Sequence, residues 1–487
     1  MIKYCVSICS EDISSAIQKI NQVYDRTDLI EIRIDKFRKF DLNALRKFDL
    51  KKMILTLRNR SNGGFFSGSE KERINLLKTF LDFGFGFMDI EYDIPKNDLK
   101  WFLCNRTNTK IILSYHNFVE TPGNLEKICA KLISHNPDLI KVISHSNSIN
   151  DNKLIFDLID KYKNIVKLVM HSMGECGEIS RILGGLRGNA FTFTSFGDEA
   201  TAPGQISLEK LSDTYNLSRL KRDFKVYGLF GNPVKHSFGY IIHNFAFDKN
   251  KNNSIYLNFL SDDAGSFIEN YRDLFTGLSI TIPFKKSIMP FLDEIDSDAE
   301  IIGAVNTVVK KKGKLIGYNT DYTGFIESLK RYITPRNKRI VILGSGGSAR
   351  AVVVSLLNKK NEITILNRNI ENAKKLAIEF SCGYGDLSEF KNHAPQVLVN
   401  CTPSGMYPNI NESPVALNKL RNCVVYDLIY NPYHTKLLVD ACRNGNTIVS
   451  GFEMFLRQAQ EQYKLFTGEN FSYLKYRNYF LKKLSII

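Results

Sequence analysis

Short apolar runs alternate with amphipathic segments through the first 210 residues of the chain. Eight of these runs are rich in β-branched and aromatic residues, which is typical of buried strands. The expected strands are residues 5–9, 29–35, 53–58, 87–92, 110–116, 139–144, 166–171 and 191–196. Segments of helical period, such as DISSAIQKINQVY at residues 12–24, separate most of them. This series of strand–helix pairs predicts an α/β fold that begins with a (β/α)8 TIM barrel.

Ionisable residues lie near the carboxyl ends of the expected strands. They are Glu31, Arg33, Asp35, Arg58, Glu91 and His116, with Lys141 inside the sixth strand. Barrel enzymes build their active sites at this face. A purely structural barrel would not place ionisable groups there, so the pattern indicates an active site in the first half of the chain.

The alternation changes near residue 212, where the segment SDTYNLSRLKRDFK is polar and has no extended apolar repeat. We place a domain boundary there. A new strand is expected at residues 225–230, and NKRIVILGSGGSARAVVVSLL at residues 337–357 opens a further α/β unit. The expected domains are residues 1–212, 223–334, 335–450 and a helical segment, 451–487, that returns to the second domain.

The composition is that of a soluble globular protein, with 43% hydrophobic and 24% charged residues. The net charge of +15 is spread along the chain, with lysines alternating with acids as in SEKER at residues 69–73. This spread argues against a nucleic-acid partner and suits small anionic substrates. Neither a secretory signal nor a membrane-length apolar run is found, so we expect a cytoplasmic protein without a membrane partner. The nine cysteines lack zinc-site spacing, and no metal is expected.

Lys141 has apolar neighbours in DLIKVIS, where an ammonium group would be poorly hydrated. Desolvation lowers the pKa of an amine, as a nucleophilic lysine requires, although a strand lysine is also a common partner for a buried acid. His116 on the preceding strand would move the protons that an iminium makes labile, or it is a packed core histidine. The pair favours carbonyl chemistry.

The motifs EIRID, TLR, DIE, SYHNF, IKV, SRILGG and APGQ occur in order across about residues 1–210. Together they resemble the type I 3-dehydroquinate dehydratases. The resemblance implies a Schiff base between Lys141 and the substrate ketone, with His116 as the proton shuttle. The substrate-binding residues that it implies are Glu31, Arg33 and Arg58 for the ring hydroxyls, Arg181 and Gln205 for the carboxylate and hydroxyl end, and Thr201.

One position departs from this family. Asn62 stands where a glutamate usually supports the histidine. An amide orients an imidazole but does not stabilise its cation as a carboxylate does, so we expect a slower dehydratase.

The run RIVILGSGGSARAVV combines an apolar strand, a glycine loop and a helix start, the context in which such a loop binds a dinucleotide. Gly344, Gly346 and Gly347 let the backbone approach a pyrophosphate at the helix amino terminus. The next expected strand, residues 362–368, ends in Asn367 and Arg368 where an NAD enzyme places an acid. An arginine there favours the 2′-phosphate of NADP(H).

Seven motifs in the second half resemble the shikimate dehydrogenases in their order, over about residues 225–475. They are GNPVKHS, SITIPFK, GAVNT, GYNTDYTG, NCTPSGM, DLIYNPYHT and GFEMFLRQA. The resemblance implies a two-lobed enzyme with a Rossmann NADP-binding domain and Lys285 and Asp321 as the catalytic pair. The implied substrate-binding residues are Ser237, Thr281, Asn306, Thr320, Tyr430 and Gln458. The implied cofactor-binding residues are Gly344, Ser345, Gly346, Gly347, Ser348, Asn367, Arg368, Thr402, Met406 and Gly451.

Two positions depart from this second family. Gly239 replaces a serine that would bind the substrate carboxylate, which costs about 1 kcal/mol of binding and enlarges the pocket near C1, where quinate carries an extra hydroxyl. Asn372 replaces a basic residue that often binds the 2′-phosphate, and Lys374 or Lys375 would substitute for it. The larger pocket at Gly239 leaves quinate oxidation open as an alternative.

The two resemblances together imply a fused enzyme. Its expected reactions are the dehydration of 3-dehydroquinate to 3-dehydroshikimate and the reduction of 3-dehydroshikimate to shikimate with NADPH. The alternatives are a dehydrogenase half that acts mainly on quinate, and an inactive sensor of quinate or shikimate. Retention of all four expected catalytic residues argues against the sensor. The sequence leaves the oligomeric state open.

Overall fold

The computed structural model describes residues 2–235, 237–357 and 359–483. The chain divides into two compact units. One comprises Met1–Phe224 with Phe247–Asn270, and the other comprises Lys225–Ala246 with Tyr271–Ile487. Across the described ranges, no helix is both long and apolar enough to cross a bilayer.

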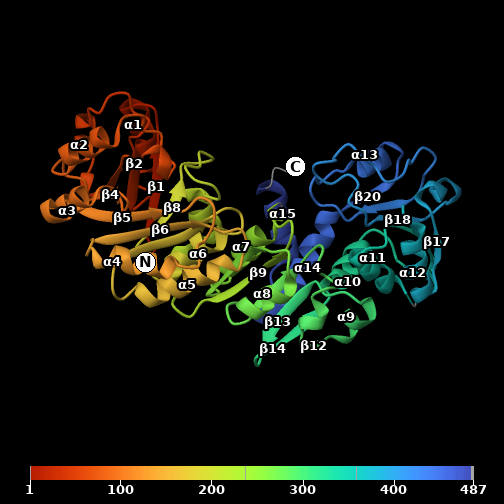
Figure 1. Cartoon of the computed structure of the whole chain (residues 1–487). Helices are drawn as coiled ribbons and strands as arrows, with labels where there is room; N and C mark the ends of the chain where they lie inside the picture. Colours follow the sequence, from red (N-terminus) through yellow and green to blue (C-terminus); the bar gives the residue numbers. More distant parts are fainter. Residues whose placement is uncertain (1, 236, 358, 484–487) are drawn as a thin grey trace. The chain divides into compact units, whose positions relative to one another are not determined.

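The first half of the chain is the predicted eight-stranded parallel barrel, which is confirmed (Figure 1). The strands are β1 Tyr4–Cys9, β2 Leu29–Arg33, β3 Met53–Thr56, β4 Phe87–Glu91, β5 Lys110–His116, β6 Leu139–His145, β7 Leu168–Met173 and β8 Thr192–Ser195, in the order β7-β6-β5-β4-β3-β2-β1-β8. The backbone N–H of Ala190, just before β8, donates to the Leu168 carbonyl of β7 at 2.8 Å and joins the two outer strands. The helices are α1 Ile13–Val23, α2 Glu70–Phe80, α3 Lys96–Asn105, α4 Leu125–Ser134, α5 Asp151–Tyr162 and α6 Glu178–Arg187.

The barrel interior changes from apolar to polar toward the carboxyl ends of its strands. Its apolar floor consists of Cys5, Ile54, Ile112, Leu139, Val169, Phe191 and Phe193. Because alternate residues of a strand share a face, the residue two positions after a floor residue also points inward. Lys141 follows Leu139 in this way, and His171 follows Val169. The floor therefore supports a layer of polar side chains at the active-site end of the barrel.

The segment that follows the barrel buries more apolar side chains than its polar sequence indicates. It forms a π-helix, Lys210–Tyr215, and a 3-10 helix, Leu217–Arg219. Leu211, Tyr215 and Leu217 are fully buried. The sequence pattern misses this packing because the three residues do not repeat at a regular helical or strand spacing.

The next sheet is mixed and has the strand order β10-β9-β11-β13-β14-β12. Its strands are β9 Lys225–Gly231, β10 Ser254–Leu260, β11 Gly277–Ile280, β12 Glu294–Ile295, β13 Thr307–Lys311 and β14 Lys314–Tyr318. The helices of this region are α7 Gly239–Lys249, α8 Ala264–Tyr271, α9 Ser297–Ile302 and α10 Thr320–Leu329. Asn319 caps α10 by accepting a hydrogen bond from the backbone N–H of Asp321 at 3.1 Å.

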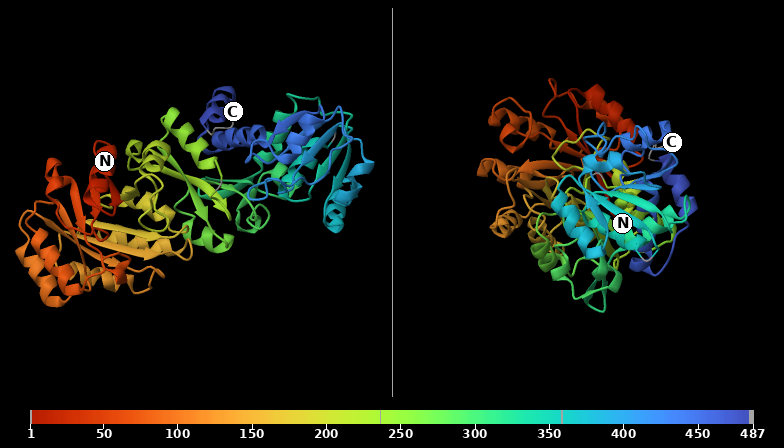
Figure 2. Two further views of the ribbon diagram at one scale, coloured as in Figure 1. Left: turned by 90° about the horizontal axis from the view of Figure 1, so that it is seen from above. Right: turned by 90° about the vertical axis from the view of Figure 1, so that its right-hand side faces the viewer.

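The third sheet is parallel, with the order β17-β16-β15-β18-β19-β20 of a doubly wound Rossmann fold. It lies in the part of the chain coloured from cyan to blue in Figure 2, with helices beside its strands. Its strands are β15 Arg339–Leu343, β16 Glu362–Leu366, β17 Gly383–Gly385, β18 Val397–Asn400, β19 Val424–Asp427 and β20 Thr447–Ser450. One apolar cluster joins the sheet to α11, Gly347–Leu356, and α12, Ile370–Phe380. A second cluster joins it to α13, Lys436–Arg443. The predicted two-lobed architecture with a Rossmann domain is thus confirmed.

The chain ends in α14, Gly451–Thr467, and α15, Tyr473–Lys483. α14 packs along α10, and Gly324 of α10 lies at their contact. A Cβ atom at Gly324 would lie 2.9 Å from Gln458 Cβ and 3.0 Å from the Met454 carbonyl oxygen. This close approach places Gln458 beside the first turn of α10.

Substituting Gly324→Val is expected to force α10 and α14 apart. Overpacking of this kind costs about 1–3 kcal/mol. We expect a lower midpoint of denaturant unfolding, measured by circular dichroism. The exposed substitution Glu327→Ala on the same helix is the control, and an unchanged midpoint for Gly324→Val would contradict the close packing.

Candidate active sites

Lys141 of β6 lies at the centre of a buried ionic cluster in the barrel. Its Nζ is 3.0 Å from Asp89 Oδ2, 3.3 Å from Glu31 Oε1 and 4.2 Å from the centroid of the Phe193 ring. The apolar sequence neighbours do not form this environment, because successive side chains of a strand point to opposite faces. The amine is buried, as the sequence predicts, and the acid partner that the sequence left as an alternative is present as two carboxylates, Asp89 and Glu31.

Arg58, two residues after β3, links His116 to the same cluster. Its Nη1 is 3.2 Å from His116 Nδ1, and its Nη2 donates to Asp89 Oδ2 at 2.7 Å. A guanidinium only donates, so Nδ1 of His116 is the acceptor and the ring is neutral. Burial, reinforced by the cations Arg58 and Lys141, lowers the pKa of His116 well below its ordinary value.

Asp89 is a central residue that the sequence reasoning missed. It is fully buried on β4, and its second oxygen accepts from Ser114 Oγ at 2.6 Å. Burial raises the pKa of a carboxyl, but Arg58 and Lys141 outweigh it and hold the pKa of Asp89 well below the ordinary range. The available signal was its position two residues before Glu91 on the same face of the strand.

Glu31 on β2 links its neighbouring strands β1 and β3 to Lys141. It accepts from Ser7 Oγ at 2.5 Å and from Thr56 Oγ1 at 3.0 Å. Thr201 Oγ1 in turn donates to Ser7 Oγ at 3.1 Å, and its backbone N–H donates to Gln205 Oε1 at 2.7 Å. The loop that carries these two predicted substrate contacts is thus tied to the ionic cluster.

The other predicted charges of the barrel form pairs around this centre. Arg33 makes two hydrogen bonds of 2.8 Å to Asp35. Glu91 bonds Arg73 Nη1 at 2.7 Å and lies 3.5 Å from Arg58 Nη1. Arg73 is a second residue that sequence reasoning missed, because it comes from α2 rather than from a strand end.

Asn62 makes its contacts away from the imidazole. Its Nδ2 donates to Asn59 Oδ1 at 3.0 Å and to Asp93 Oδ2 at 3.5 Å. The described part of the chain contains no hydrogen bond between Asn62 and His116. Phe118 stacks on the His116 ring instead, with 6.0 Å between the ring centroids.

Arg181, in the first turn of α6, is buried and contacts His171 and the loop before Gln205. Its Nη1 is 2.7 Å from His171 Nε2, and its Nη2 donates to the Pro203 carbonyl at 3.1 Å. Burial lowers the pKa of Arg181 from 12.5 to about 10. A buried cation held only by neutral groups is suited to binding an anion.

The second site is built around an ion pair between Lys285 and Asp321. Lys285 Nζ is 2.5 Å from Asp321 Oδ2, and both side chains are mostly buried. Asn306 donates to Asp321 Oδ1 at 2.8 Å and to Thr320 Oγ1 at 3.0 Å. Asp321 also stands in the first turn of α10, where the helix dipole favours a carboxylate. The fold thus brings together two residues of the predicted pair that are 36 positions apart in the sequence.

α14 brings two glutamines to this pair. Thr320 Oγ1 lies 3.4 Å from Gln458 Oε1. Gln462, which sequence reasoning missed, bonds the Asn306 carbonyl at 3.2 Å and Ser279 Oγ at 2.8 Å. Its spacing of four residues after Gln458 was the available signal, because residues i and i+4 share a helix face.

The remaining predicted substrate contacts lie around Tyr430. Its ring stacks on Phe455 of α14, with 4.3 Å between centroids. Burial raises the pKa of the Tyr430 phenol, and a hydrogen bond with Ser237 opposes the rise. Ser237 Oγ also accepts from the backbone N–H of Gly239 at 3.1 Å. Thr281 follows β11 and packs against Gly231 of β9.

The glycine loop between β15 and α11 has the geometry that a dinucleotide needs. Gly344 has a φ of +103°, and a Cβ atom there would lie 3.2 Å from the Cys401 carbonyl carbon. Gly346 caps α11 without a side chain, and a Cβ atom there would meet nothing within 4 Å. Free backbone N–H groups at a helix start bind phosphate, so the loop fits the pyrophosphate of a nucleotide. Ser348 Oγ lies 3.4 Å from Lys285 Nζ, which joins this loop to the ion pair of Lys285 and Asp321.

The other predicted cofactor contacts follow the carboxyl ends of neighbouring strands. Asn367 and Arg368 follow β16, and Arg368 is exposed. Thr402 follows β18 and donates to Asn400 Oδ1 at 2.7 Å, while Met406 is exposed in the same loop. Gly451 starts α14 so close to Leu428 that a Cβ atom would lie 2.2 Å from its carbonyl oxygen. Ser345 completes the glycine loop.

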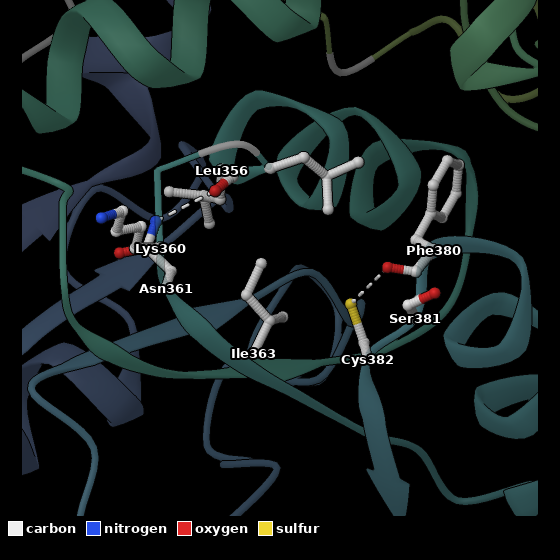
Figure 3. A pocket seen from close by; sticks show the side chains of 8 residues that line it. Leu356, Lys360, Asn361, Ile363, Phe380, Ser381 and Cys382 are labelled. Carbon is white, nitrogen blue, oxygen red and sulfur yellow. Dashed lines mark hydrogen bonds between the residues drawn. The ribbon is translucent and has the colours of Figure 1, made fainter.

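A pocket of the Rossmann domain lies away from this loop (Figure 3). Leu356 and Phe380, at the carboxyl ends of α11 and α12, line it together with Ile363 and Cys382. Ile363 stands near the amino end of β16, whereas the glycine loop follows the carboxyl end of β15. The pocket therefore contains none of the predicted site residues.

Three family models match successive parts of the chain. Residues 4–222 match the type I 3-dehydroquinase model. Residues 229–308 match the shikimate dehydrogenase substrate-binding domain, and residues 328–422 match the shikimate/quinate 5-dehydrogenase model. The order is that of the two sites described above.

Two curated relatives extend over nearly the whole chain. A bifunctional 3-dehydroquinate dehydratase/shikimate dehydrogenase of Arabidopsis thaliana, described as chloroplastic, is 33% identical over 95% of this chain and 82% of its own length. A shikimate biosynthesis protein of Chlamydia pneumoniae is 29% identical over 95% of this chain and 94% of its own length.

A solved shikimate dehydrogenase in complex with NADP+ matches the second half. It is 38% identical, with a TM-score of 0.52, over 54% of this chain and 97% of its own. The shikimate dehydrogenase of Aquifex aeolicus is 33% identical, with a TM-score of 0.50, over 53% of this chain and 98% of its own. The chain therefore belongs to the bifunctional 3-dehydroquinate dehydratase/shikimate dehydrogenases, with the type I dehydratase in its first half and the dehydrogenase in its second.

Proposed function

We propose that Lys141 forms a Schiff base with 3-dehydroquinate, and that Lys285 and Asp321 transfer the proton when 3-dehydroshikimate is reduced to shikimate. The observation that supports both assignments is the same in each site. A buried lysine lies within 3.0 Å of a carboxylate at the point where the predicted substrate contacts converge.

The ionic cluster of the barrel suits an iminium intermediate. Attack of the Lys141 amine on the ketone, with loss of water, leaves a positive charge at Nζ. Asp89 and Glu31, at 3.0 and 3.3 Å from Nζ, stabilise that charge. The iminium acidifies the neighbouring carbon, and the neutral His116 accepts its proton. The same imidazole then returns a proton to the departing hydroxyl, and hydrolysis of the imine releases the product and regenerates Lys141.

The proposed substrate contacts of the barrel are polar side chains that surround Lys141. Arg181 binds the substrate carboxylate, together with Gln205 and Thr201. Arg33, Arg58 and Glu31 bind ring hydroxyls. Asn62 does not support His116, so the dehydratase works with Arg58 and Phe118 as the neighbours that hold the imidazole.

The ion pair of the second site suits proton transfer at a carbonyl oxygen. Lys285 donates a proton to the oxygen that becomes the alcohol, and Asp321 holds the ammonium in place. Asn306 and the first turn of α10 hold the Asp321 carboxylate in position. The substrate contacts proposed around the pair are Ser237, Thr281, Asn306, Thr320, Tyr430 and Gln458.

NADP(H) is the proposed cofactor, and it supplies the hydride when bound. Gly344, Ser345, Gly346, Gly347 and Ser348 would hold its phosphates. Arg368, exposed just after β16, would bind the 2′-phosphate beside Asn367, and Thr402, Met406 and Gly451 would border the nicotinamide. The NADP+ complex of a shikimate dehydrogenase that is 38% identical supports this assignment.

The proposed domains are residues 1–212, 223–334, 335–450 and 451–487. The partners are small anionic substrates, which suit the net charge of +15, without nucleic acid or membrane. A cytoplasmic location belongs to the same proposal.

Reduction with borohydride in the presence of 3-dehydroquinate is expected to trap one substrate per chain on Lys141. The adduct is measured by intact mass and located by peptide mapping. Lys141→Ala should lose both the adduct and dehydratase activity, whereas Lys167→Ala, just before the next strand, should keep both. An adduct at another lysine, or none, would overturn the Schiff-base assignment.

Lys285→Ala and Asp321→Asn are each expected to lower shikimate oxidation by about 10²–10⁴-fold, the usual contribution of a positioned proton donor. The dehydratase step, followed separately by absorbance of 3-dehydroshikimate, should keep its rate in both variants. Lys286→Ala is the matched control. Wild-type oxidation rates in either catalytic variant would exclude the pair.

A mainly quinate-oxidising dehydrogenase is the second candidate, because Gly239 leaves Ser237 without a neighbouring hydroxyl. We expect shikimate to be preferred in NADP+ reduction. We also expect Gly239→Ser to raise kcat/KM for shikimate relative to quinate by about fivefold, the effect of about one hydrogen bond. Faster turnover of quinate by the unaltered chain would reverse the assignment.

A further inference from the structure

The buried guanidinium of Arg181 makes no ion pair in the part of the chain that the structure describes. Glu178, one turn earlier on α6, acts on it only at longer range and pairs with Lys210 instead. The Arg181 side chain is 2% exposed, and among the described residues no carboxylate oxygen lies within 4.0 Å of it. Within residues 2–235, 237–357 and 359–483, two of its five N–H groups have partners, His171 Nε2 and the Pro203 carbonyl. The Nε–H is buried and meets no acceptor in the described chain. Arg181 is therefore held by neutral groups and keeps its full charge.

His171 is the side-chain partner that holds Arg181. The distance of 2.7 Å from its Nε2 to Arg181 Nη1 is that of a good hydrogen bond. Because a guanidinium has no acceptor, Nε2 carries the lone pair and the ring proton is on Nδ1. Burial and the cations Arg181 and Lys141 lower the pKa of His171 well below its ordinary value. The imidazole therefore stays a neutral acceptor.

His171 also belongs to the wall of the barrel that carries Lys141. His171 on β7 pairs with Ile143 on β6. Ile143 comes two residues after Lys141, so both point to the same face of the sheet. Its ring lies 6.4 Å from the Phe193 ring at an interplanar angle of 23°, and Lys141 Nζ lies over that same ring. Within the described residues, Nδ1 of His171 is buried without a protein partner. His171 thus joins Arg181 to the Schiff-base lysine through one aromatic side chain.

We infer that His171 is a positioning residue of the dehydratase, which orients Arg181 toward the substrate carboxylate without neutralising it. The inference rests on the proposed role of Arg181 and adds a residue that acts through it. A neutral acceptor is the feature that matters. An apolar residue would leave Nη1 without a partner, and a carboxylate at this position would pair with the guanidinium and compete with the substrate.

The test compares three substitutions at position 171 in the full chain. His171→Leu removes the acceptor and is expected to raise KM for 3-dehydroquinate about tenfold, with kcat changed less than about threefold. His171→Gln places an amide oxygen near the position of Nε2 and should restore KM to within about threefold of the unaltered chain. His171→Glu should raise KM more than His171→Leu, because it neutralises Arg181.

Two controls separate positioning from folding. The shikimate oxidation rate of the same chains should stay constant, because it belongs to the other half. Met170→Leu, a buried substitution of similar volume next to His171 on β7, should leave KM unchanged. An unchanged KM in His171→Leu, or a loss in His171→Gln equal to that in His171→Leu, would overturn the inference.

Arg181→Gln separates this inference from the proposed function. If Arg181→Gln leaves KM unchanged, the carboxylate site itself is wrong. If Arg181→Gln raises KM and His171→Leu does not, only the positioning role fails. With both roles correct, the double variant should show the KM of Arg181→Gln alone, because His171 acts through the guanidinium.

Discussion

A charge buried away from water must be compensated, and this requirement organises both sites of the chain. Asp89 and Glu31 compensate Lys141 in the barrel, and Asp321 compensates Lys285 in the dehydrogenase half. Each carboxylate is in turn held by hydroxyl, amide or guanidinium donors, as Asp321 is by Asn306. Lys141 and Lys285 therefore have fixed positions, which a flexible side chain in water would not have.

Arg181 is a buried cation that makes no ion pair in the described part of the chain. Arg181 is buried against the neutral groups His171 and the Pro203 carbonyl, so a bound anion would gain more from it than from a cation that is already paired. His171 makes this arrangement tolerable by accepting one N–H without adding charge. The barrel thus holds two kinds of buried cation, one paired with carboxylates and one held by neutral groups.

The second half depends on close backbone approaches as much as on charge. Gly344 lets the loop after β15 pass beside Cys401, and Gly324 and Gly451 let α14 lie against α10 and the strand-end loop at Leu428. These contacts bring Gln458 and Gln462 to Thr320, Asn306 and Ser279. The ion pair and the nucleotide loop are further joined by the contact between Ser348 and Lys285.

The sequence by itself determined the fold class and singled out the lysines at the centre of each ionic cluster, because both depend on local order. Strand-length apolar runs predict the barrel, and the strand–glycine loop–helix pattern predicts the Rossmann domain. Only the tertiary structure decided which groups surround those residues. Asp89, Arg73, His171 and Gln462 came from strands and helices whose inward faces become evident only when neighbouring elements are packed. The apolar residues next to Lys141 in the sequence point to the outer face of β6. The Lys141 side chain points to the inner face, where its neighbours are ionic, because successive side chains of a strand point to opposite faces.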